Sequence, residues 1–303
     1  MRNPWGCAVA LLLAAVVAGF LLGRSSRLTS PAGSYSVARP PGDRPAGEQP
    51  AVGPAPPRDR PAHSAAAPEW RRGHPPRRPA DHAAGRAVII IDDLGASRQA
   101  CERFLRLPAD LTFSFLPDAP LAQTLSAQVA AQGRCVLLHL PMEPVAKNER
   151  LEPDTITTRM SASEIDAAVR AALAAVPSAV GVNNHMGSRA TTDEDVMRAV
   201  LRPLAERGLF FVDSRTIPHS VAPRVAQQLG VPLLARDVFL DPEPQRDAAQ
   251  VMANMQALAH LARAQGLAVG IGHPFTATAE GIERGLAYFD QTGVQVVAAS
   301  DAL

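Results

Sequence analysis

The chain has 303 residues, with 30 basic and 29 acidic side chains, 4% aromatic residues and three cysteines. This charge balance and the scarcity of aromatic residues exclude a typical nucleic-acid-binding protein. Three cysteines are too few for a disulfide-rich or zinc-finger scaffold, and the chain is long enough to bury a core without such cross-links.

The first element in chain order is an apolar run at residues 7–23, bounded by Arg2 and Arg24. Its 17 uncharged residues are at the lower limit of the roughly 20 that span a bilayer as a helix. A cleaved signal peptide has a shorter apolar core followed by small residues, which residues 15–19 also offer. We expect residues 1–24 to be a signal anchor in the inner membrane, with a cleaved signal peptide as the alternative. Either places the rest of the chain outside the cytoplasmic membrane.

Residues 25–85 lack the repeated aliphatic residues of a folded domain and contain 13 of the 28 prolines. Such a segment cannot bury enough apolar surface to offset its ordering entropy, so a disordered linker is expected. Residues 24–86 carry a net charge of +6, whereas residues 87–303 carry −6. The nearly neutral total therefore combines a basic arm with an acidic domain.

Residues 86–303 alternate short apolar runs with amphipathic stretches. The runs occupy residues 87–91, 111–116, 135–138, 179–182, 209–212, 231–234, 267–271 and 294–298. Strands that are apolar without alternation are typical of a parallel sheet buried on both faces. This pattern predicts one α/β domain, a distorted (β/α) barrel with about seven or eight mostly parallel strands, and the alternative is an open doubly wound sheet.

Local signals mark the helices between these runs. Ser161 and Glu164 form a predicted capping box at a helix start, and Gly208 and Gly230 are expected at helix ends. Cys101 and Cys135 are expected to be separate, buried thiols. No nucleotide-binding glycine motif follows any predicted strand.

Acidic and imidazole side chains follow several strands directly. Asp92 and Asp93 end the first run, and His139, His185 and His273 follow the third, fourth and seventh. Right-handed β–α units bring these ends to one edge. Adjacent carboxylates repel each other unless a cation or proton offsets them. Asp and His side chains suit a divalent ion such as Zn²⁺, which activates water and polarises a carbonyl.

Other polar residues at this edge are additional candidates: Glu143, Asn184, Asp213 and Asp237. Asp213 has an equally good interpretation as a helix cap. Asp241 is interpreted as a turn residue in a proline-rich stretch.

The domain resembles the divergent polysaccharide deacetylase family, a bacterial envelope branch of the polysaccharide deacetylase (carbohydrate esterase) superfamily. The resemblance rests on five motifs: Ile-Asp-Asp-Leu-Gly at 91–95, Leu-His-Leu-Pro-Met-Glu-Pro at 138–144, Gly-Val-Asn-Asn-His-Met-Gly-Ser at 181–188, Val-Asp-Ser at 212–214 and Gly-His-Pro at 272–274. It covers residues 86–303 and implies the superfamily's distorted barrel.

The resemblance also implies roles for individual residues. Asp92 matches the general base, Asp93 and His139 match metal ligands, and His273 matches the imidazole that protonates the leaving group. Glu143 stands where the superfamily has its second metal-binding histidine, so either Glu143 or His185 supplies the remaining ligand. The superfamily's Arg-x-Pro-Tyr motif is absent, and Asn183-Asn184-His185 occupies roughly its place.

Two functions follow from this resemblance. The first is a metal-dependent hydrolase, with zinc as the expected ion, that removes acetyl groups from an N-acetylated envelope polysaccharide. The second is a catalytically inactive glycan-binding or scaffolding protein of the envelope. In both, an envelope glycan is the partner, residues 7–23 contact the inner membrane, and the domain lies in the periplasm.

Overall fold

The computed structural model describes residues 83–147, 150–243 and 247–303. The expected membrane segment and most of the expected linker, residues 1–82, lie outside these ranges. Within them, no helix is both long and apolar enough to cross a membrane.

Nine strands form one sheet: β1 (Gly85–Leu94), β2 (Thr112–Phe115), β3 (Cys135–Met142), β4 (Gly181–Met186), β5 (Phe210–Asp213), β6 (Leu233–Ala235), β7 (Val238–Phe239), β8 (Leu267–Gly272) and β9 (Val294–Val296). The α-helices are α2 (Arg98–Leu105), α3 (Ala122–Ala131), α4 (Ala162–Ala175), α5 (Glu194–Arg207), α6 (Ala222–Leu229), α7 (Ala248–Gln265) and α8 (Thr276–Thr292). Two short 3₁₀ helices, η1 (Ala190–Thr192) and η2 (Ala299–Asp301), complete the described elements.

All eight predicted apolar runs form strands, and every strand pairing is parallel, which confirms the α/β prediction. The sequence pattern does not predict the ninth strand, β7. It has only two residues, and one of them, Phe239, is exposed. A strand this short has no hydrophobic periodicity to detect.

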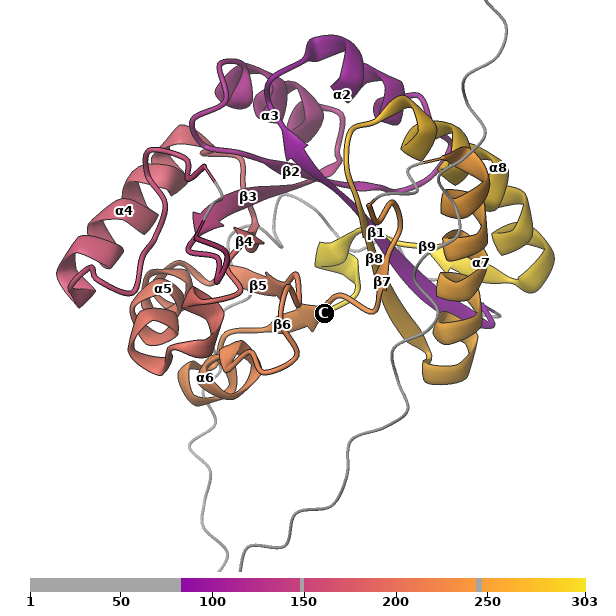
Figure 1. Cartoon of the computed structure of the whole chain (residues 1–303). Coiled ribbons are helices and arrows are strands. Elements are labelled where there is room, and N and C mark those ends of the chain that lie inside the picture. The colour runs from indigo at the N-terminus through magenta and orange to yellow at the C-terminus, as the bar shows by residue number, and fades with distance from the viewer. Residues whose placement is uncertain (1–82, 148–149, 244–246) are drawn as a thin grey trace, which may run out of the picture. The chain divides into compact units, whose positions relative to one another are not determined.

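The strand order is β6-β5-β4-β3-β2-β1-β8-β7, and β9 pairs with the start of β1. Figure 1 shows this sheet curled, with helices on its outer side. In the described chain, β6 and β7 stand at the two ends of this order and are not paired with each other. The two residues between them bind the strands on either side: the Arg236 N–H donates to the Asp213 carbonyl of β5 (2.9 Å), and the Asp237 N–H donates to the Val269 carbonyl of β8 (2.8 Å). The distorted barrel is confirmed. A doubly wound sheet would reverse its strand order at β1, so that alternative is wrong.

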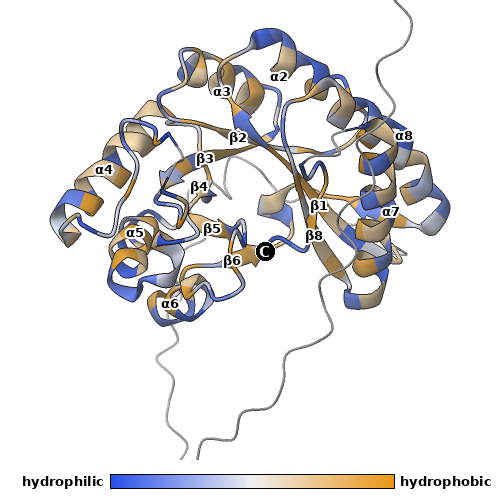
Figure 2. Cartoon of the chain, viewed as in Figure 1, coloured by the Kyte–Doolittle hydropathy of each residue, from blue (hydrophilic) through white to orange (hydrophobic). Residues whose placement is uncertain are grey.

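Side chains of β1 alternate between two cores. Ala87, Ile89 and Ile91 belong to the larger core beneath the helices, whereas Val88 and Ile90 belong to the smaller core inside the curl. Figure 2 shows apolar colour along most strands and mixed colour on the helices. The strands are thus buried on both faces, as their continuous apolar runs predict.

The helix ends follow the predicted local signals. Ser161 and Glu164 form a complete capping box at the start of α4. Gly208 and Gly230 end α5 and α6 in the left-handed conformation, where glycine carries no steric penalty. Cys101 and Cys135 are buried and free, as predicted.

Replacing Gly281 by alanine tests the close packing of α8 on α7. A methyl group at Gly281 would lie 2.4 Å from Val251 Cβ. Helix propensity alone predicts stabilisation by up to about 1 kcal/mol. We expect the opposite, a loss of about 1–3 kcal/mol in the free energy of unfolding, because the helices would have to separate.

Urea denaturation measures this effect. Glu283→Ala, on the exposed side of the same helix, is the control and should change stability by no more than about 0.5 kcal/mol. A Gly281→Ala protein as stable as the original would contradict the close approach.

Candidate active site

Two adjacent carboxylates reach the same site because β1 bulges at its end. A regular strand sends neighbouring side chains to opposite faces. Asp93 instead has a φ of 55°, and the pairing of β1 with β2 shifts register between Ile91 and Leu94. Consequently, His139 Nε2 lies 3.7 Å from Asp92 Oδ2 and 3.2 Å from Asp93 Oδ1.

Three side chains converge at this point: Asp93, His139 and His185. His185 Nδ1 lies 3.0 Å from Asp93 Oδ1 and 3.2 Å from His139 Nε2. One ligand atom from each residue falls within 4.8 Å of the other two, a grouping that suits a metal ion. Asp93 and His139 are predicted metal ligands, and His185 is one of the two residues predicted for the remaining position; the three come from β1, β3 and β4.

Left-handed backbone at non-glycine residues is confined to this edge in the described structure. The three examples are Asp93, Met186 (φ 52°) and Arg215 (φ 45°), at or just after the ends of β1, β4 and β5. Such conformations cost about 1–3 kcal/mol each and concentrate at functional sites. Here they turn the chain directly beside the converging side chains.

Asn183 of β4 connects the buried members of the site. Its Nδ2 donates to Asp92 Oδ1 (2.8 Å), and its Oδ1 lies 2.9 Å from His139 Nδ1 and accepts from the Ser114 hydroxyl. Because Oδ1 can only accept, His139 Nδ1 carries a proton. In the neutral imidazole, Nε2 is then an unprotonated nitrogen facing Asp93.

His273 is held by a second carboxylate. Its Nδ1 donates to Asp241 Oδ1 (2.9 Å), and its backbone N–H donates to Asp241 Oδ2 (2.7 Å). The Thr278 hydroxyl also donates to Asp241 Oδ2. The second ring nitrogen, Nε2, faces the converging side chains at 3.9 Å from Asp93 Oδ2. Asp241 is therefore part of the site and positions His273.

The family profile described as divergent polysaccharide deacetylase matches residues 89–303. The chain belongs to this family. It is 37% identical over 204 residues to an uncharacterized protein of Haemophilus influenzae, an alignment that covers 67% of this chain and 72% of that protein. It is 36% identical over 220 residues to uncharacterized protein YibQ of Escherichia coli, covering 73% of this chain and 68% of YibQ.

Two solved structures share the fold of this chain. An uncharacterized protein of Agrobacterium tumefaciens C58 matches with a TM-score of 0.71 and 23% identity, over 77% of this chain and 94% of that chain. A putative cellobiose-phosphate cleavage protein of Enterococcus faecalis V583 matches with a TM-score of 0.54 and 13% identity, over 72% and 98% of the two chains. At these identities the comparison concerns the fold alone.

The structure does not bring Glu143 into the converging group. Its Oε2 accepts from the backbone N–H and the hydroxyl of Thr158, each at 2.7 Å, and its Oε1 lies 3.7 Å from Arg189 Nε. β3 ends at Met142, so strand alternation no longer fixes the direction of the next side chain. In this member of the family, His185 and not Glu143 lies beside Asp93 and His139.

The other additional candidates bind backbone at the same edge. Asn184 accepts from the Ser214 N–H (2.9 Å) and donates to the Met186 carbonyl. Asp213 accepts from the Arg215 N–H, and Asp237 accepts from the Val269 N–H. Asp213 is not a helix cap, because α6 begins nine residues later, at Ala222. These three residues stabilise the turns around the site.

Sequence reasoning misses two members of the site, Asn183 and Asp241. Asn183 is a neutral residue inside a strand, and only its alternation with His185 along β4 signals that both face inward. Asp241 follows a strand too short to predict and precedes a proline, a combination that resembles a turn.

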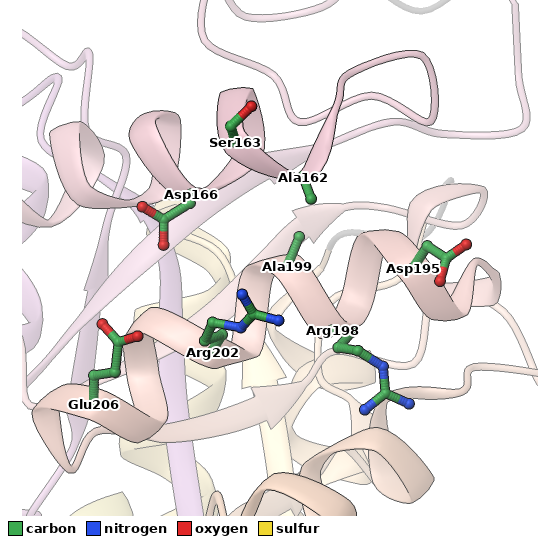
Figure 3. Close-up of a pocket in the computed structure, with 8 residues that line it drawn as sticks. All are labelled: Ala162, Ser163, Asp166, Asp195, Arg198, Ala199, Arg202 and Glu206. Carbon is green, nitrogen blue, oxygen red and sulfur yellow. The ribbon is translucent and has the colours of Figure 1, made fainter.

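A separate hollow of about 720 Å³ lies between α4 and α5 (Figure 3). Three of the charged side chains that line it bind residues outside the lining: Asp166 and Glu206 contact Arg170, and Arg198 contacts Glu194. No member of the converging group lines it. Its polar groups therefore do not single out a ligand.

Burial and the close pairing of opposite charges shift the pKa values of the site residues in opposite directions. Burial raises the pKa of Asp92 above its usual range. Burial would also raise the pKa of Asp93, but the close contacts of its carboxylate with the His139 and His185 rings hold it well below its usual value. For His139, burial lowers the pKa, yet the charges of Asp92 and Asp93 prevail and raise it to about 9. For His273, Asp241 likewise outweighs burial and raises the pKa.

The stability of the metal-free protein should therefore fall between pH 6.5 and 8.5. His139 has a folded-state pKa of about 9, above the value of 6.5 for a free imidazole. Its stabilising contribution is complete below pH 6.5 and declines as pH rises towards 9, and His273 acts in the same direction. We expect these imidazoles to account for a loss of up to about 3 kcal/mol over this interval.

Urea denaturation in the presence of a chelator measures this loss. His139→Gln should flatten the profile, whereas His260→Gln, in α7 and bonded to Tyr288, should retain the full slope. A flat profile for the unaltered chain would show that His139 is not charged in the metal-free protein.

Proposed function

We propose that the protein is a divalent-metal-dependent hydrolase that removes acetyl groups from an N-acetylated envelope polysaccharide. The observation that carries this proposal is the convergence of Asp93, His139 and His185 beside a buried carboxylate, Asp92, and a carboxylate-supported imidazole, His273. Membership of the divergent polysaccharide deacetylase family supports the class of reaction and of substrate.

The residues present fit a zinc ion. One carboxylate oxygen and two imidazole nitrogens form the donor set, and three such ligands leave a position open for water. Asp93 Oδ1 is buried without a hydrogen bond of good geometry in the described structure, although two ring nitrogens lie 3.0 and 3.2 Å away. Such a convergence of acceptor atoms needs a cation or protons between them. When bound, a divalent ion supplies a Lewis acid that polarises the acyl carbonyl and lowers the pKa of water.

Asp92 is suited to the role of general base. Its carboxylate is 2% exposed, accepts from Asn183, and has a pKa raised by burial, so it binds a proton more readily than an exposed aspartate. In the proposed reaction Asp92 accepts a proton from the water that adds to the acetyl carbonyl carbon.

His273 is suited to the role of general acid. Asp241 holds its Nδ1–H and raises its pKa, so the ring is protonated at a higher pH than a free imidazole. Its Nε2, which faces the site, donates a proton to the sugar nitrogen as the carbon–nitrogen bond breaks. The products are acetate and a free amino sugar. Asp92 then releases its proton to water and His273 takes one up from water, which restores both residues.

Apolar side chains beside His273 support a sugar substrate. The rings of Phe239 and Phe275 have centroids 5.2 and 6.1 Å from that of His273, and both side chains are exposed by more than a third. Exposed apolar groups around a polar site mark binding surfaces, and the C–H face of a sugar ring packs on aromatic rings. A polymeric envelope substrate also fits the periplasmic location that the proposal includes.

Removing the Asp93 carboxylate, which both His139 and His185 contact, tests the metal site. Asp93→Asn should weaken Zn²⁺ binding by at least about 10–100-fold, because the donor set loses its negative charge. Asp237→Asn is the matched control, since that carboxylate lies at the same edge but binds the Val269 N–H. Competition with a chromophoric chelator measures both. Equal zinc affinity in the two variants would mean that Asp93 is not a ligand.

Removing the proposed base or acid tests the reaction. Asp92→Asn and His273→Gln should each lower kcat for acetate release from chitooligosaccharides or peptidoglycan fragments by about 10²–10⁴-fold. Zinc content should stay unchanged, and the control His260→Gln should keep full activity. If the unaltered, zinc-loaded protein binds these glycans without releasing acetate, the proposal of a hydrolase is wrong and that of a glycan-binding protein is favoured.

A further inference from the structure

The two nitrogens of the His185 ring have different surroundings. Nδ1 faces Asp93 and His139, whereas Nε2 is buried and has no hydrogen-bond partner in the described part of the chain. Glu152 Oε2 lies 3.9 Å from this Nε2. Because the two ring nitrogens point away from each other, Glu152 stands on the far side of the imidazole from the converging group. It is therefore not one of the grouped metal-ligand atoms.

A histidine that binds a metal through one nitrogen carries its proton on the other, and an acceptor for that proton fixes the ring. His139 has this arrangement, since its Nδ1–H donates to Asn183 and its Nε2 faces Asp93. His185 faces the group through the opposite nitrogen, so its Nε2 carries the proton. The carboxylate of Glu152 has the chemistry to accept it.

The loop that carries Glu152 is anchored to β3 next to the site. Ile156 is fully buried and pairs with β3, where its N–H donates to the Pro141 carbonyl (2.9 Å) and its carbonyl accepts from the Glu143 N–H (2.8 Å). The Glu143 side chain binds Thr158 twice, as described above. Glu143 thus holds the C-terminal end of this loop, at Thr158, against the end of β3.

A turn fixes the backbone of Glu152 itself. Its carbonyl accepts from the hydroxyl of Thr155 at 2.8 Å and from the backbone N–H of the same residue at 3.2 Å. The Glu152 side chain remains 27% exposed and makes no shorter contact with His185 than 3.9 Å. A rotation of this side chain alone, by about 1 Å at the oxygen, brings it to hydrogen-bond distance of Nε2.

We propose that Glu152 is a positioning residue that accepts the Nε2 proton of His185 and so orients Nδ1 towards the metal, and that Glu143 holds the loop that presents it. The inference rests on the proposed metal site. It gives Glu143 a function although its side chain lies outside the ligand group. His185 of the neighbouring strand β4 supplies the ligand, and Glu143, directly after β3, supports the loop whose Glu152 orients His185.

Zinc affinity of the purified full-length chain, measured by chelator competition, tests the proposal. Glu152→Ala should weaken Zn²⁺ binding about 10–100-fold. Glu152→Gln keeps an oxygen that accepts the proton and should recover part of this loss. Asp154→Ala removes an exposed carboxylate from the same loop and should change the affinity less than about twofold. Glu143→Ala should weaken binding, and its effect should be smaller when Glu152 is already alanine.

Two further measurements separate positioning from structural damage. The metal-free Glu152→Ala protein should unfold at the same urea concentration as the original, and the visible absorption of the Co²⁺-loaded protein should change only in the Glu152 and Glu143 variants. If the unaltered chain binds no zinc, the proposed function fails and this inference with it. If it binds zinc and Glu152→Ala binds equally well, or if Asp154→Ala weakens binding as much, the role of Glu152 alone is overturned.

Discussion

The left-handed backbone at Asp93 is the constraint on which the candidate active site depends. With regular strand geometry, Asp93 would point into the core beneath the helices, where an unpaired carboxylate is costly. The bulge at the end of β1 turns it to the same side as Asp92. The conformation costs about 1–3 kcal/mol, and the contacts with His139 and His185 offset that cost.

The amide of Asn183 is the second constraint. It is fully buried and contacts side chains from β1, β2 and β3 at once. Only an amide can donate to the Asp92 carboxylate with one atom while it accepts from His139 and Ser114 with the other. An aspartate there would repel Asp92, and an apolar residue would leave buried polar atoms without partners. The same amide also fixes which nitrogen of His139 faces Asp93.

Much of this arrangement could be predicted because it follows strand periodicity. Uninterrupted apolar runs indicate a parallel sheet, and the carboxyl ends of parallel strands meet at one edge, so Asp92, Asp93, His139, His185 and His273 could be grouped from the sequence. Spacing along a strand does not fix the direction of a side chain beyond the strand's end, which is why Glu143 remained an open candidate. The role of Asp241 depends on β7, whose two residues carry no periodic signal.

Protons on two imidazoles of the site offset part of the charge of its carboxylates. Asp92, Asp93 and Asp241 lie among His139, His185 and His273, and the raised pKa values of His139 and His273 let protons neutralise part of the negative charge. A cation that binds Asp93, His139 and His185 must displace the protons held between them, because only the deprotonated imidazole nitrogen is a ligand. The contacts that hold these side chains in place in the metal-free protein therefore also set the free energy of exchanging protons for a metal. Asn183 acts on this exchange in two ways: it orients His139 Nε2 towards Asp93, and it raises the pKa of His139, which makes the proton harder to displace.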